Sequence, residues 1–298
     1  MNRKLPPQRI AITGASGLIG TPLVGHLRSE GHTVQRLVRR APVSSDEVRW
    51  DPQGGTVDLE PLRGVDAIIH LAGAGVGDKR WRKEYKAEIL NSRLLGTTAI
   101  AAAVNELKPS VFISGSAIGW YGETGNRAVS ETDRAGDDFL ATVCREWEGA
   151  ADSVEGVRTV KIRTGLVLDP TGGALGRMLP LFRMGLGGRL GSGQQWWSWI
   201  TLHDQIRAIC HLLESNLSGP VNLTAPNPAT NQEFTAALAR ALHRPALFPA
   251  PGFALKLALG GFSTEILGSK KVLPTALLED GFEFEYSHIV NALNALIE

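Results

Sequence analysis

The stretch of sequence that decides the fold reads Arg9-Ile10-Ala11-Ile12-Thr13-Gly14-Ala15-Ser16-Gly17-Leu18-Ile19-Gly20. A short apolar run leads into three glycines, and a helical pattern of apolar residues follows until Gly31, a residue type that commonly ends helices. A strand, a glycine-rich turn and a helix in this order are typical of a dinucleotide site, because the backbone can approach a pyrophosphate resting on the helix N-terminus. The alternative is a tight turn without a ligand. The residues expected to contact the nucleotide are Thr13, Gly14, Ser16, Gly17, Leu18 and Ile19.

The composition is that of an ordinary globular protein. The chain has 298 residues, of which 43% are hydrophobic and 20% charged. Its net charge of +1 favours neither nucleic acid nor an anionic membrane as a partner. Cys144 and Cys210 are the only cysteines, so we expect neither a disulfide framework nor a metal site. Residues 1–8 lack the apolar core of a signal peptide, and no apolar run has the length of a membrane span. We therefore expect a cytoplasmic protein.

Strand and helix patterns alternate from residue 9 to about residue 225. Strands are expected at Thr33–Val38, Asp66–Leu71, Val111–Ile113, Thr159–Arg163 and Val221–Thr224, and helices at Lys83–Leu107, at Asp137 to about Val154 and at about His203–Glu214. This succession predicts an α/β fold with a doubly wound parallel sheet of the Rossmann type and helices on both faces. A smaller C-terminal α+β lobe follows.

The chain divides into two units on composition. Residues 1–240 are expected to form the nucleotide-binding domain, with the glycine-rich segment 170–195 leaving the sheet toward a substrate cleft. Residues 245–298 are expected to form a small C-terminal domain. There the alternation at Phe282–Tyr286 predicts a strand, and Ser287 is a candidate cap for a final helix.

The end of the second strand indicates which dinucleotide is bound. An NAD site places an acidic residue there for the ribose 2′-hydroxyl, whereas an NADP site places arginine. This chain has Arg39 and Arg40, with no acid before Asp46. A guanidinium binds a 2′-phosphate through charge-assisted hydrogen bonds. The cofactor is therefore predicted to be NADP, held by Arg39 and Arg40; the alternative is that one of the two is only a surface charge.

Several motifs resemble the extended short-chain dehydrogenase/reductase superfamily: T-G-A-S-G-L-I-G at 13–20, H-L-A-G at 70–73, S-G-S at 114–116 and Y-G at 121–122. More narrowly, H-L-A-G-A-G-V at 70–76, W-R-K at 81–83, C-R-E-W-E at 144–148 and the tail from about 250 resemble the NAD(P)-dependent epimerase-like branch with a C-terminal domain of unknown function, often labelled nucleotide-sugar epimerase or cell-division-inhibitor-like. The resemblance implies an oxidoreductase or epimerase acting on a small, sugar-like or nucleotide-linked substrate. It adds these residues to the expected cofactor site: Leu71, Ala72, Gly73 and Ser114.

The chain departs from this superfamily at its catalytic pair. The superfamily uses a tyrosine and a lysine four residues later on one helix, which places both on one face. Here Leu140 falls where the tyrosine is expected and Cys144 where the lysine is expected, and no tyrosine in the chain is followed four residues later by lysine. Cys144 is either chemically active or a small buried apolar residue.

Two residues are the candidates for the missing chemistry. Ser116, or alternatively Ser114, matches the superfamily serine that ends a strand, and Tyr121 follows Ser116 as a substitute phenol. The alternative for Tyr121 is a wall of the pocket. Arg93 lies where the superfamily often has an asparagine, and it either reaches the floor of the active site or pairs with an acid. Two functions remain open: an NADP-dependent oxidoreductase or epimerase, or a non-catalytic NADP-binding sensor.

Overall fold

The computed structural model describes residues 6–298, so the first five residues of the polar N-terminal segment considered above lie outside it. Its centre is an eight-stranded sheet with the order β12-β8-β6-β5-β1-β2-β3-β4. The strands are β1 (Arg9–Thr13), β2 (Thr33–Val38), β3 (Glu47–Asp51), β4 (Thr56–Val57), β5 (Ala67–His70), β6 (Val111–Ala117), β8 (Arg158–Thr164) and β12 (Gly219–Leu223).

All neighbours in this sheet are parallel except β3 and β4, which are antiparallel. From β1 the chain proceeds outward to β2 and β3 on one side, and later to β5, β6, β8 and β12 on the other. The order therefore reverses at β1, and ligands of open α/β sheets bind beside such a point. The predicted doubly wound parallel sheet is confirmed.

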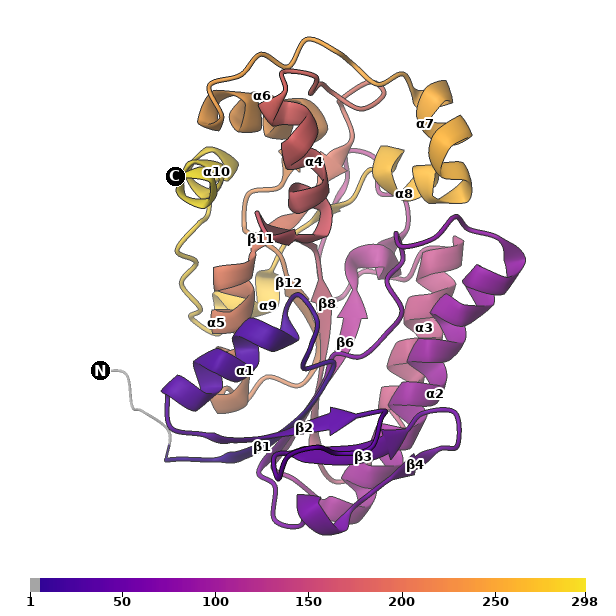
Figure 1. Ribbon diagram of the computed structural model, residues 1–298, viewed down its shortest axis with the longest axis vertical. Helices are drawn as coiled ribbons and strands as arrows, with labels where there is room; N and C mark the ends of the chain where they lie inside the picture. The colour runs from indigo at the N-terminus through magenta and orange to yellow at the C-terminus, as the bar shows by residue number, and fades with distance from the viewer. Residues whose placement is uncertain (1–5) are drawn as a thin grey trace.

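Helices cover both faces of the sheet (Figure 1). The helices of one face are α1 (Gly20–Ser29) and α5 (Leu202–Glu214), and those of the other are α2 (Lys83–Leu107) and α3 (Phe139–Ala151). Alternation along β1 supplies both cores, because successive side chains of a strand point to opposite faces. Ile10 and Ile12 join the core under α1, whereas Ala11 joins the core under α2.

The other elements extend the sheet at its carboxyl end or pack beside it (Figure 1). They are η1 (Glu60–Leu62), η2 (Ile118–Tyr121), β7 (Ala128–Val129), β9 (Leu166–Asp169), α4 (Gly173–Arg183), β10 (Trp196–Trp197), β11 (Trp199–Thr201), β13 (Ala229–Thr230), α6 (Asn231–Ala241), α7 (Gly252–Leu259), η3 (Gly260–Phe262), α8 (Ser263–Leu267), β14 (Lys271–Val272), α9 (Thr275–Glu279) and α10 (Ile289–Ile297). A third core joins α4, α6 and α10, with Phe182, Phe234 and Leu293 buried in it. The C-terminal helix thus packs on elements from the first 240 residues, and the division into two domains stays a prediction.

None of the helices in the described part of the chain combines the length and the apolar character that a membrane span requires.

The strand expected at Phe282–Tyr286 does not form. At Glu285 and Tyr286 the backbone binds a side chain instead of another strand. The carboxylate of Asp204, fully buried at the start of α5, accepts the N–H groups of Glu285 (3.0 Å) and Tyr286 (2.9 Å). The final helix also begins later than expected, at Ile289, and the Ser287 side chain does not cap it. A distant carboxylate therefore overrides the local alternation.

We expect Asp204→Ala to detach this segment. The substitution removes the acceptor of two backbone N–H groups, and each buried group left without a partner costs about 1–3 kcal/mol. The free energy of unfolding, measured by denaturant titration, should fall by about 2–4 kcal/mol. Asp58→Ala, at an exposed acid, is the control and should change it by less than about 0.5 kcal/mol. Equal stability of the two variants would show that the carboxylate does not hold the segment.

Candidate functional site

The glycine turn between β1 and α1 has the geometry expected of a nucleotide site. Gly14 has a φ of +71°, and a Cβ there would lie 2.8 Å from the carbonyl carbon of Leu71. A Cβ on Gly20 would lie 2.1 Å from the Gly14 carbonyl oxygen, so α1 packs closely on the turn only because residue 20 is glycine. A Cβ on Gly17 would meet only that oxygen, at 3.3 Å. Ser16 and Gly17 are both exposed, so the outer side of the turn is open to a ligand.

Side chains of β1 and β5 shape the floor beneath the turn. The buried Thr13 hydroxyl lies 2.7 Å from Nδ1 of His70 and accepts the N–H groups of Leu71 (3.1 Å) and Ala72 (3.3 Å). Burial lowers the pKa of His70 to about 3, so the imidazole is neutral. Thr13 therefore positions the loop after β5, which includes the expected cofactor residues 71–73.

The remaining members of the expected set are half-buried or buried. Leu18 and Ile19 lie at the start of α1, and a Cβ on Gly172 would lie 2.9 Å from Leu18. The Ser114 hydroxyl, in the middle of β6, is buried and donates to the carbonyl of Gly115 (3.3 Å). Their contacts with a nucleotide stay predictions.

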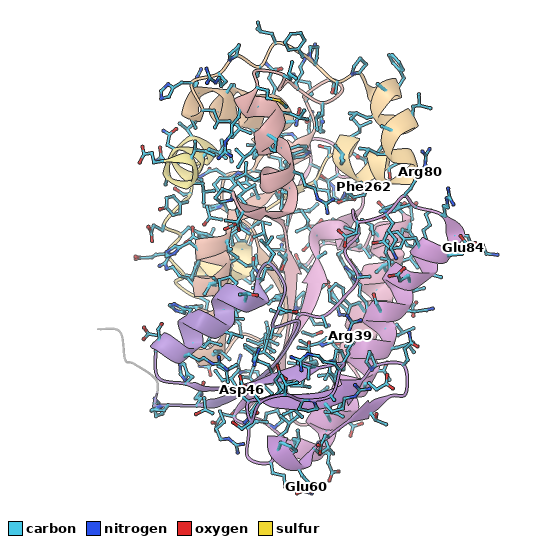
Figure 2. All side chains as sticks on the ribbon, in the orientation of Figure 1. Arg39, Asp46, Glu60, Arg80, Glu84 and Phe262 are labelled. Atoms are coloured by element: carbon cyan, nitrogen blue, oxygen red, sulfur yellow. The ribbon has the colours of Figure 1, made fainter. Side chains whose placement is uncertain are left out.

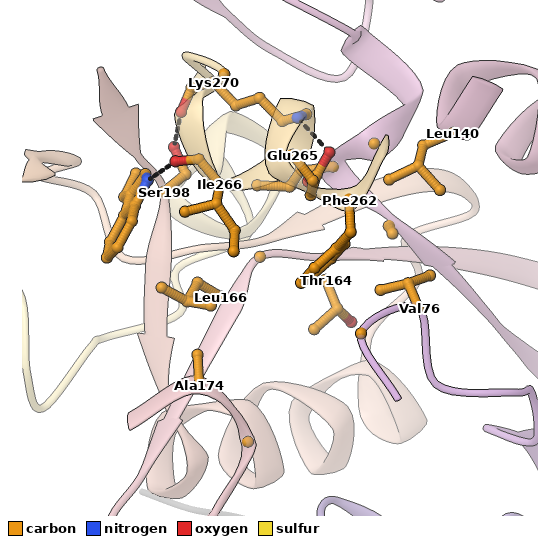
Figure 3. A pocket seen from close by; sticks show the side chains of 18 of the residues that line it. Val76, Leu140, Thr164, Leu166, Ala174, Ser198, Phe262, Glu265, Ile266 and Lys270 are labelled. Atoms are coloured by element: carbon orange, nitrogen blue, oxygen red, sulfur yellow. Dashed lines mark hydrogen bonds and ion pairs between the residues drawn. The ribbon is translucent and has the colours of Figure 1, made fainter. Parts of the chain in front are cut away.

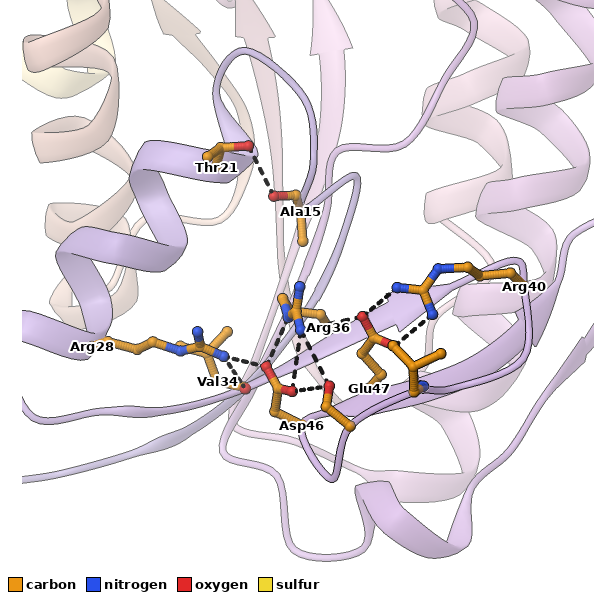
Figure 4. Close-up of polar contacts among 10 residues, drawn as sticks. Ala15, Thr21, Arg28, Val34, Arg36, Arg40, Asp46 and Glu47 are labelled. Carbon is orange, nitrogen blue, oxygen red and sulfur yellow. Dashed lines mark hydrogen bonds and ion pairs between the residues drawn. The ribbon is translucent and has the colours of Figure 1, made fainter.

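The two arginines after β2 have different environments. Arg40 donates two hydrogen bonds to the buried carboxylate of Glu47, at 2.7 and 2.6 Å (Figure 4). Arg39 is exposed, and its side chain has no partner among residues 6–298; Figure 2 shows it at the end of β2. The guanidinium of Arg36 holds the pKa of Asp46 well below its usual range, with help from Arg28. Arg39 is therefore the unengaged cation, and the acid nearest in sequence is already paired.

A cavity of about 530 Å³ lies at the carboxyl ends of β5, β6 and β8, with α8 and the segment after it on one side and α4 on another (Figure 3). Most of its lining side chains are apolar, among them Val76, Leu140, Val143, Trp147, Leu166, Met178, Trp197, Phe262 and Ile266. The segment 170–195 contributes Arg177 and Met178 of α4 and, farther along, Leu190.

The two positions where the superfamily has its catalytic pair both line this cavity. Leu140 and Cys144 lie one turn apart on α3. Burial raises the pKa of the Cys144 thiol to about 12, and the thiol donates to the carbonyl of Ala117 (3.6 Å). At neutral pH this face of α3 therefore presents an alkyl group and a protonated thiol.

Ser116 and Tyr121 belong to one buried polar network outside the cavity lining. Ser116 donates to Glu148 (2.7 Å), which also accepts two hydrogen bonds from Arg163 (2.8 and 2.9 Å). Arg163 in turn donates to the Tyr121 hydroxyl (3.0 Å), which donates to Asn222 (2.7 Å). Burial raises the pKa of Tyr121 to about 12. The structure brings the two candidates together in a stabilising network, and their catalytic role stays a prediction.

Of the residues that the structure describes, five with charged side chains line the cavity. Arg177 pairs with Asp78 (2.8 Å), and Lys270 pairs with Glu265 (2.8 Å), as Figure 3 shows for the second pair. Arg93 of α2 lies over the ring of Trp147, with 4.9 Å from Cζ to the ring centroid. Sequence reasoning missed Glu265 and Lys270, because the resemblance of the tail to a domain of unknown function assigns no role to any of its residues.

The fold and the site define a class: nucleotide-binding proteins of the dehydrogenase and epimerase type. The model of the NAD dependent epimerase/dehydratase family matches residues 10–224, and that of a domain of unknown function, DUF1731, matches residues 250–296. The chain belongs to the NAD-dependent epimerase/dehydratase family. The resemblance found in the sequence is thus confirmed.

Similar proteins come from bacteria, plants and animals. An epimerase family protein of Mycobacterium bovis is 46% identical over 288 residues, covering 95% of this chain and 96% of the relative. The chloroplastic SDR39U1 homolog of Arabidopsis thaliana is 38% identical over 309 residues, with 100% and 89% covered. The crystal structure of human SDR39U1 (isoform 2) with NADPH superimposes with a TM-score of 0.90 at 32% identity, covering 97% of this chain and 99% of that one. The predicted cofactor agrees with this relative.

We expect Gly17→Val to remove nucleotide binding while leaving the fold intact, because a side chain at position 17 would occupy the open side of the turn. Calorimetric titration should show NADPH affinity reduced by at least about tenfold, with an unchanged melting temperature. Gly14→Ala is the contrasting variant: its positive φ and close backbone contact predict a loss of both affinity and stability. Unchanged affinity in a folded Gly17→Val protein would contradict the assignment of this turn.

Proposed function

We propose that this protein is an NADP(H)-dependent oxidoreductase or epimerase-like enzyme of the epimerase family, and that its small-molecule substrate occupies the cavity at the carboxyl end of the sheet. The observation that carries the proposal is the position of this cavity. It lies at the carboxyl ends of the parallel strands β5, β6 and β8, on the side of β1 away from β2. Ligands of open α/β folds bind at this edge of the sheet.

The cofactor fits the residues of this chain. Gly14, Gly17 and the N-terminus of α1 would hold the pyrophosphate, and Arg39 would bind a 2′-phosphate. The human relative is solved with NADPH, which supports the same preference here. When bound, NADP(H) supplies the hydride chemistry.

We expect Arg39→Ala to weaken NADPH binding and leave NADH binding unchanged, because only NADPH has the 2′-phosphate. A charge-assisted hydrogen bond contributes about 1.5–3 kcal/mol, or about 10–100-fold in affinity. Arg40→Ala is the matched control, since Arg40 is already bound to Glu47, and should change NADPH affinity by less than about threefold. Calorimetric titration of both cofactors measures these values. A larger effect of Arg40→Ala, or tighter binding of NADH by the wild type, would contradict the assignment.

The chain's own residues supply little acid–base catalysis at the cavity. Leu140 and the protonated Cys144 cannot exchange a proton with a substrate oxygen at neutral pH. Turnover is therefore expected to be slow, with the proton coming from water, from the substrate or from a side chain outside this pair.

The same observation favours a second candidate function, a non-catalytic NADP-binding sensor. An apolar face in place of the Tyr/Lys pair preserves a ligand cavity without the chemistry that the pair performs. The two functions differ in turnover and share cofactor binding.

Oxidation of NADPH in the presence of small carbonyl compounds tests the two functions. Measurable turnover supports the enzyme, whereas tight NADPH binding with no turnover supports the sensor.

Within an active protein we expect Tyr121→Phe to lower the melting temperature, because it breaks the bonds to Arg163 and Asn222, and to retain turnover within about threefold. Tyr286→Phe, away from the cavity, is the control. A loss of about 10²–10⁴ in rate at unchanged stability would instead assign acid–base chemistry to Tyr121.

A further inference from the structure

Among the charged side chains that line the cavity in residues 6–298, one cation has no carboxylate partner. Of the five charged side chains that line it, Asp78 pairs with Arg177 and Glu265 pairs with Lys270. Arg93 has no carboxylate partner among the described residues. The lining as a whole therefore has a net charge of one positive unit, located at Arg93, in a wall that is otherwise largely apolar.

The guanidinium of Arg93 is held in place and still has donors to offer. Its Nη1 donates to the backbone carbonyls of Ala74 (2.9 Å) and Ile89 (3.1 Å), and its plane packs on Trp147. Its Nε and Nη2 bind no protein atom in residues 6–298, and neither is sealed from solvent. The N–H groups on Nε and Nη2 form the fork that matches the two oxygens of a carboxylate.

Burial lowers the pKa of Arg93, the direction expected for a cation removed from water. An arginine nonetheless stays protonated in proteins. A desolvated charge without a counter-charge is unfavourable, and an anionic ligand would relieve it. Because the lining carries a single excess charge, a monoanion balances it, whereas a nucleotide diphosphate would leave negative charge in an apolar wall.

From this geometry we infer that Arg93 binds the carboxylate of a substrate whose remaining part is apolar, and that the wall formed by Leu166, Trp197, Phe262 and Ile266 receives that apolar part. The inference rests on the proposed function only in taking the cavity as the substrate site. It narrows the substrate class to apolar monocarboxylic acids.

The test uses two probes of equal shape, 3-phenylpropanoate and 3-phenylpropanamide, neither of which has a ketone or aldehyde to reduce. Each is titrated by calorimetry into the full-length protein saturated with NADP⁺. The wild type should bind the acid about tenfold or more tightly than the amide, because only the acid forms the charged fork with Arg93. Arg93→Gln should remove this preference while the amide's affinity stays within about threefold. Arg93→Lys should retain part of it.

Two further measurements distinguish carboxylate binding by Arg93 from a general effect of positive charge and from a role of Arg93 in cofactor binding. Arg145→Gln, on the exposed side of α3, is the matched control and should keep the preference for the acid. NADP⁺ affinity is measured for every variant, because a fall of about tenfold or more in Arg93→Gln would make Arg93 a cofactor residue and overturn the inference. Equal binding of the two probes by the wild type, or no binding of either at millimolar concentration, would also overturn it. An absence of turnover leaves the probe result unaffected, so the proposed function and this inference fail separately.

Discussion

The buried ion pair between Glu148 of α3 and Arg163 of β8 is the interaction on which the site depends. Both residues are 2% exposed, so each charge needs its full set of partners. Ser116 of β6 donates a further hydrogen bond to Glu148, and the Tyr121 hydroxyl accepts one from Arg163. Removing one member of such a pair typically costs about 3–5 kcal/mol, because the other is left buried and uncompensated. The pair thereby fixes the height and rotation of α3 against the sheet.

The rotation of α3 decides which of its side chains meet the cavity. With Glu148 turned toward Arg163, the residues at 140, 143, 144 and 147 face the cavity as a continuous stripe. This stripe follows helical spacing, so a single buried contact near one end aligns all of it. The polar network and the apolar wall are consequences of the same packing, and the network lies outside the lining of the cavity.

The sequence was sufficient to predict those elements whose conformation depends on residues close together in the chain. The glycine turn was predicted correctly because φ at Gly14 and the close approach at Gly20 are properties of a few neighbouring residues, and α2 was predicted correctly at both ends, Lys83 and Leu107. Prediction failed where a distant group intervenes. The segment around Glu285 was expected to be a strand, but the carboxylate of Asp204, some eighty positions earlier, takes its backbone donors. Likewise, the position of Ser116 at a strand end did not reveal that Glu148 would take its hydroxyl.

The charged group of the site stands at a different position from the one in the superfamily pattern. In the superfamily pattern the cation is a lysine on α3, at the position of Cys144 here, and position 93 is often a neutral asparagine. In this chain position 144 is a neutral thiol and position 93 is arginine, so among the described residues that line the cavity one cation, on α2, has no carboxylate partner. A lysine at 144 would lower the pKa of a tyrosine one turn away, which position 140 no longer provides. A guanidinium at 93 has no such neighbour to activate, and its fixed fork suits binding rather than proton transfer. If Arg93 binds a carboxylate, as we infer, this chain differs from the superfamily pattern in two linked features: it lacks the Tyr/Lys pair that moves a proton, and it has at position 93 a cation suited to binding an anion.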